Sequence, residues 1–127
     1  ANPQAAQRFA ETAVTRCVEL REEYGVRLTP WMHNVEVNSG TRPRGLCYHW
    51  ADDLRDVLRP LASPYWSVYK IKAKPKTPRE HNALSVTKLG DDWQNGIVLD
   101  GWRNAGVLYT GPVKGDKYPW ERPSKNQ

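Results

Sequence analysis

Three residues, Cys47, His81 and Asp100, have the types and the chain order of a nucleophile, its base and the group that orients the base. A thiol is an effective nucleophile when a proton acceptor lies within hydrogen-bond reach, and an imidazole acceptor needs its own partner to fix its orientation. A Cys opens a predicted helix, a His opens a predicted strand and an Asp closes the next strand. This combination predicts a catalytic triad.

The helix expected to carry Cys47 runs from about Leu46 to Arg59. Pro60 should end it, because the proline ring cannot continue the hydrogen-bond ladder. Cys47 then lies in the first turn, where unpaired backbone N–H groups and the positive end of the helix dipole favour a thiolate. The same N–H groups are suited to receive an oxyanion. The predicted apolar stripe of this helix consists of Trp50, Ala51, Leu54, Val57 and Leu58.

His81 and Asp100 are expected at neighbouring strand ends. Residues 82–89 and 96–102 are rich in β-formers, and the segment between them is turn material, so the two strands should form an antiparallel hairpin. The centre of symmetry between positions 81 and 100 falls near the front of that turn. The two side chains should therefore lie opposite or diagonal to one another, close enough for a carboxylate to hold an imidazole N–H.

The remaining elements form the frame. Apolar residues at three- and four-residue steps predict an amphipathic helix over 3–24, ended by Gly25. Residues 26–45 read as an irregular connection with a short extended piece at 35–37, residues 65–74 as a strand, and residues 106–110 as a last edge strand. The expected fold class is α+β: N-terminal helices, with the nucleophile at a helix N-terminus, packed on a small antiparallel sheet of three to four strands.

The segments 45–58, 81–86 and 97–102 resemble, in their order, the transglutaminase-like branch of the papain-type cysteine enzymes, including the bacterial transglutaminase-like cysteine proteinases. The resemblance implies that Cys47 attacks an acyl carbon, that His81 takes and returns protons, and that Asp100 fixes the imidazole tautomer. It implies a thiol-dependent peptide or amide hydrolase with a peptide or protein substrate and no cofactor.

Three alternatives stay open at this point. A disulfide between Cys17 and Cys47 would abolish thiol chemistry, although Cys17 falls within an apolar helical stripe and suits a buried free thiol. Cys47, His49, His81 and Asp100 have the ligand types of a zinc site, although residues 47 and 49 project from different faces of a helix. A binding module of the same fold without activity is the third.

Two features of the site are not fixed by the sequence. The backbone N–H of Cys47 is one candidate oxyanion donor, and a second is expected from the irregular connection, where Asn34, Asn38 and Thr41 are available. The tryptophans are expected mostly in the core, with a groove lining as the other reading.

Composition bounds the class of protein. The 127 residues fit one domain, 1–127, with 111–127 a tail that packs Tyr118 or Trp120 on the body, and no apolar run is long enough for a membrane span. The net charge of +5 favours an acidic partner or a cell-wall polymer, but no nucleic-acid motif accompanies it, so nucleic acid is not expected. The start at Ala1 without Met is typical of a processed or trimmed N-terminus, and a periplasmic or secreted protein is expected.

Overall fold

The computed structural model describes residues 3–26, 46–77 and 80–123. Two helices, α1 (Pro3–Tyr24) and α3 (Cys47–Ala62), precede five strands: β1 (Trp66–Ala73), β2 (His81–Lys88), β3 (Ile97–Asp100), β4 (Tyr109–Pro112) and β5 (Trp120–Pro123). A short 3-10 helix, η1 (Trp93–Asn95), connects β2 to β3. This arrangement confirms the α+β class. The expected irregular connection over 26–45 lies outside the described residues except for Val26.

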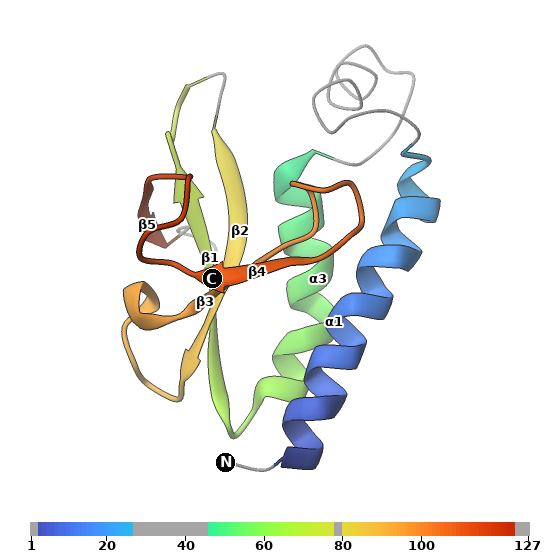
Figure 1. Cartoon of the computed structure of the whole chain (residues 1–127), viewed down its shortest axis with the longest axis vertical. Helices are drawn as coiled ribbons and strands as arrows, with labels where there is room; N and C mark the ends of the chain where they lie inside the picture. The colour runs from blue at the N-terminus through green and yellow to red at the C-terminus, as the bar shows by residue number, and fades with distance from the viewer. Residues whose placement is uncertain (1–2, 27–45, 78–79, 124–127) are drawn as a thin grey trace.

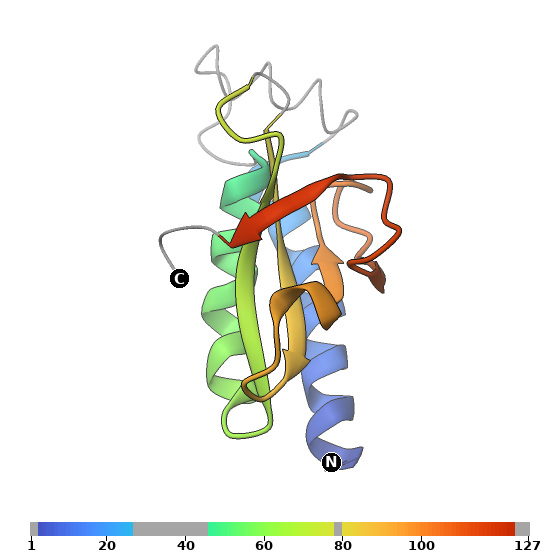
Figure 2. The same cartoon turned by 90° about the vertical axis from the view of Figure 1, so that its left-hand side faces the viewer.

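Both helices lie on one face of the sheet (Figure 2). Helix α3 packs on β1 and β2, and α1 packs along α3, so that the two helices stand side by side (Figures 1 and 2). The ring of Phe9 in α1 also lies 5.2 Å from that of Trp66 in β1. The buried side of α1 follows the three- and four-residue spacing of an amphipathic helix and consists of Phe9, Ala13, Cys17, Leu20 and Tyr24. The structure confirms the predicted helix over 3–24 and the buried position of Cys17.

The prediction that Pro60 ends the second helix is wrong. Pro60 lies inside α3, which continues to Ala62, and the N–H of Ser63 still bonds the carbonyl of Arg59 at 3.4 Å. A proline removes one ladder hydrogen bond and crowds the preceding turn. Here Leu58 and Ala62 lie in the core on either side of it, and their burial offsets that cost.

The sheet is antiparallel throughout, with strand order β4-β3-β2-β1-β5. The expectation of three to four strands is corrected to five. After β4 the chain crosses to the opposite edge of the sheet, where residues 120–123 pair with β1 (Figure 2). A strand of the tail that pairs with β1 far back in the chain has no local sequence signal.

The sheet has an apolar cluster on each face. Leu84 and Leu99 belong to the cluster shared with the helices, whereas Ile71, Ala83 and Val98 belong to a second one. Aromatic side chains pack against the second cluster: Tyr69, Trp93, Tyr109 and Trp120. Alternation of side chains along a strand thus divides β1, β2 and β3 between the two clusters. Within the described residues, no helix is long and apolar enough to cross a membrane.

Candidate active site

Cys47 is the first residue of α3. Leu46 before it has an extended backbone, and its carbonyl accepts hydrogen bonds from the N–H groups of His49 and Trp50 at 3.0 and 3.2 Å. The N–H groups that open an α-helix have no acceptor within the helix. The structure therefore places the predicted nucleophile where the sequence predicts it, beside N–H donors and the positive end of the helix dipole.

His49 makes a hydrogen bond that closes the start of α3. Its Nδ1 accepts the backbone N–H of Leu46 at 3.1 Å, and its side chain is buried next to the helix start. Over residues 3–26, 46–77 and 80–123, no group of three or more Cys, His, Asp or Glu residues is arranged to hold a metal ion. Cys17 and Cys47 are both free thiols, so the disulfide alternative does not apply.

The β2–β3 pairing brings His81 to Asp100. Leu84 pairs with Leu99 in the ladder, and the same register places Asp100 opposite Ala83, which makes His81 its diagonal neighbour. Nε2 of His81 lies 2.6 Å from Oδ2 of Asp100. The beginning of β2 and the first turn of α3 lie at the same end of the molecule (Figure 1). The hairpin prediction for this pair is confirmed.

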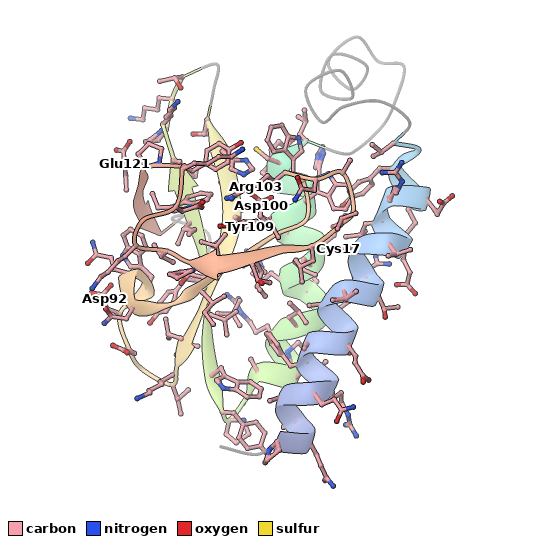
Figure 3. The ribbon with its side chains drawn as sticks, viewed as in Figure 1. Cys17, Asp92, Asp100, Arg103, Tyr109 and Glu121 are labelled. Atoms are coloured by element: carbon pink, nitrogen blue, oxygen red, sulfur yellow. The ribbon has the colours of Figure 1, made fainter. Side chains whose placement is uncertain are left out.

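The carboxylate of Asp100 is held by four donors. Oδ1 accepts the backbone N–H groups of Trp102 and Arg103, each at 3.0 Å, and Oδ2 accepts Nε of Arg103 at 3.1 Å in addition to His81. Asp100, Arg103 and Tyr109 lie together in Figure 3. Because both oxygens accept hydrogen bonds, the orientation of Asp100 is fixed by the protein itself.

Asp100 gives His81 an unusual proton affinity. Burial by itself disfavours the charged imidazole, but the hydrogen bond and charge of Asp100, with a further contribution from Cys47, raise the pKa of His81 to about 9. Nδ1 of His81 is buried and has no hydrogen-bond partner among the described residues. Since Nε2 is hydrogen-bonded to Asp100, Nδ1 is the ring nitrogen that does not face Asp100.

Asn82 is a site residue that the sequence analysis missed. Its Nδ2 donates to Sγ of Cys47 at 3.6 Å, and the carbonyl of Glu80 lies 3.6 Å from the same sulfur. The two-residue period of the strand was the available signal. It places Asn82 on the same face of β2 as Leu84, which packs against the helices. His81 and Asn82 thereby approach the site from the two faces of β2.

Aromatic rings enclose His81. The ring centre of His81 lies 4.7 Å from that of Trp102, 4.4 Å from that of Tyr118 and 5.4 Å from that of Trp120. The prediction that Tyr118 or Trp120 packs on the body is confirmed for both residues. Asn34, Asn38 and Thr41, the predicted side-chain oxyanion donors, lie outside the described residues.

Comparison of the chain with protein-family models, with curated proteins and with solved structures finds no match. The geometry of the site combines a cysteine at a helix N-terminus, a buried histidine and a carboxylate that holds the histidine.

Proposed function

We propose that the protein is a cysteine-dependent acyl-transfer enzyme that hydrolyses peptide or amide bonds, of the transglutaminase-like, papain-type class. The observation that carries this proposal is the 2.6 Å hydrogen bond between His81 and Asp100 beside Cys47. A structural histidine does not require a buried carboxylate with four donors on one side and an unpartnered ring nitrogen on the other. A histidine that carries protons uses both features, one to fix the orientation of the ring and the other to exchange the proton.

Acylation follows from this arrangement. The thiolate of Cys47 attacks the substrate carbonyl carbon, a bond from Sγ to carbon forms, and the carbonyl oxygen takes the negative charge. The proton on Nδ1 of His81 moves to the leaving nitrogen as its bond to carbon breaks, which releases an amine and leaves a thioester. Asp100 keeps its hydrogen bond to Nε2 throughout and stabilises the charged imidazole.

Deacylation restores the enzyme. Neutral His81 accepts a proton from water as the water oxygen attacks the thioester carbon, and the bond from carbon to Sγ breaks to release a carboxylic acid. The thiolate and the charged imidazole return together. The backbone N–H of Cys47 and the side-chain amide of Asn82 are the donors next to the sulfur. In each half-reaction they donate hydrogen bonds to the oxyanion.

Acylation by 4-nitrophenyl acetate tests the proposal without a known substrate. We expect a burst of nitrophenolate equal to the enzyme concentration and an acetyl group on Cys47 in the intact mass. Cys47→Ala should abolish the burst, and Asp100→Asn should slow it about 10³-fold or more, because the carboxylate that stabilises the charged imidazole is lost.

Cys17 provides the matched control. It is fully buried, and burial together with the charge of Asp100 raises the pKa of its thiol to about 12. Cys17→Ala should therefore leave the burst unchanged. A folded wild-type protein that takes no acetyl group on Cys47 would contradict the proposal and favour a binding module of the same fold.

A further inference from the structure

Arg103 lies between two buried carboxylates behind the His81–Asp100 pair. Its Nε donates to Asp100 at 3.1 Å, and its Nη1 and Nη2 donate to Oδ1 and Oδ2 of Asp116 at 2.9 and 2.7 Å. The side chains of Asp100 and Asp116 are each 1% exposed, and that of Arg103 is 6% exposed. Two-pronged contacts between a guanidinium and a carboxylate are strong and well defined in geometry. A row of three charged groups therefore begins at the proposed triad.

Arg103 and Asp116 also contact aromatic residues that pack on His81. The guanidinium carbon of Arg103 lies 3.7 Å from the ring centre of Tyr109 and 4.7 Å from that of Tyr118. Asp116 also accepts the indole N–H of Trp120 at 2.8 Å. Because Tyr118 and Trp120 are rings that pack on His81, the Arg103–Asp116 pair reaches the histidine from a second side.

Asp100 does not depend on the Arg103 side chain for its location. Its Oδ1 is fixed by two backbone N–H groups, and its Oδ2 still has His81. What the side chain of Arg103 adds to Asp100 is therefore mainly positive charge. The formal charges of Asp100, Asp116, Arg103 and a protonated His81 cancel. Removal of the cation or of the outer anion changes this balance in opposite directions.

We propose that Arg103 and Asp116 are positioning residues of the site: Arg103 offsets the charge of Asp100, Asp116 offsets the charge of Arg103, and together they set the pH range in which His81 exchanges its proton with Cys47. This inference rests on the proposed function. Among the described residues, other titratable groups near these side chains come from several elements: Cys47 of α3, Cys17 of α1, Tyr109 of β4, Tyr118 before β5, and the Lys72–Glu80 ion pair, at 3.6 Å, where β1 meets β2.

Titration of the His81 imidazole by NMR tests the inference directly. The chain has three histidines, and His81→Gln identifies the signal. Arg103→Met removes the cation and should raise the midpoint of the titration by about half to one pH unit. Asp116→Asn removes the outer anion, keeps an acceptor for Trp120, and should lower the midpoint by a similar amount. The pH profile of Cys47 alkylation should move in the same directions.

Two further variants separate charge from loop packing. Arg103→Lys keeps the charge and should titrate close to wild type. Arg21→Met removes a different anchor of the same loop, the contact from α1 to the carbonyl of Ala105, and should leave the His81 midpoint unchanged. If Arg103→Met fails to fold, the lowered midpoint of Asp116→Asn and the wild-type midpoint of Arg103→Lys still decide the question.

The inference and the proposed function fail differently. If Cys47 of the wild-type protein is acylated in a His81-dependent manner but Asp116→Asn, folded, titrates like wild type, Arg103 and Asp116 have only a structural role and the inference is overturned. If Cys47 is not acylated at all in the wild-type protein, the proposed function fails first, and the inference fails with it.

Discussion

His81 and Asp100 form a hydrogen bond of 2.6 Å between two side chains that are each 1% exposed. The geometry joins the first residue of β2 to the last residue of β3. Because Asp100 stabilises the charged imidazole, this pair links the protonation of His81 to the stability of the fold as well as to the proposed chemistry.

The pair predicts a specific pH dependence of stability. The pKa of His81 is about 9 in the folded protein and near its ordinary value of 6.5 in the unfolded chain. A raised folded pKa contributes stability that is fully present below the unfolded pKa and is lost as the pH rises through the folded one. From pH ~6 to pH ~10, wild type should lose on the order of 3 kcal/mol relative to His81→Gln in urea unfolding. If the free energy of unfolding changed with pH by the same amount in both proteins, the His81–Asp100 pair would make no pH-dependent contribution to stability.

Asn82 should affect acylation far more than stability. Its Oδ1 is buried without a hydrogen-bond partner in the described part of the chain, so Asn82→Ala removes an unsatisfied atom together with the donor to Cys47. Loss of a donor to the developing oxyanion typically slows the reaction about 10²- to 10³-fold. We expect a decrease of this size in the acylation rate of Cys47 by 4-nitrophenyl acetate, with little change in the urea midpoint. The exposed Asn104→Ala is the control, and equal rates in the two variants would remove Asn82 from the site.

Gly101 lies where both helices come close to the chain that follows β3, and a side chain would not fit there. A Cβ at this position would lie 2.9 Å from Cε3 of Trp50 and 3.0 Å from Sγ of Cys17. Both neighbours are buried, so neither can move freely, and overpacking of this kind typically costs about 1–3 kcal/mol. Gly101→Ala should be destabilised by this amount in urea unfolding. Cys17→Ala in the same chain should recover part of the loss, and full wild-type stability of the single variant would contradict the packing described.

The sequence predicted the features of the site that depend on local geometry. A hairpin brings together residues that lie at equal distances on either side of its turn. The His81–Asp100 contact, between residues about twenty positions apart, therefore followed from strand and turn signals alone. The position of Cys47 followed in the same way from the helix start. Asn82 was within reach of the same reasoning, because the period of a strand places it on the face of Leu84, which packs against the helices.

The missed features depend on packing between distant segments. Arg103 and Asp116 appear in the sequence as ordinary loop residues, and only the pairing of β5 with β1 brings the segment with Tyr118 and Trp120 back to His81. The extension of α3 through Pro60 likewise depends on the burial of Leu58 and Ala62. Tertiary contacts decide such cases, and the local propensity of the residues does not show them.

The most direct test of the Cys47–His81 pair is the rate of alkylation by iodoacetamide as a function of pH. The rate at Cys47 is read by mass spectrometry in the intact protein and in His81→Ala, with Cys17 as the internal buried thiol. We predict that Cys47 of the wild-type protein is alkylated at pH ~6, and that this reactivity at low pH disappears in His81→Ala. Identical pH profiles in the two proteins, or an unreactive Cys47 at every pH, would contradict the proposed site.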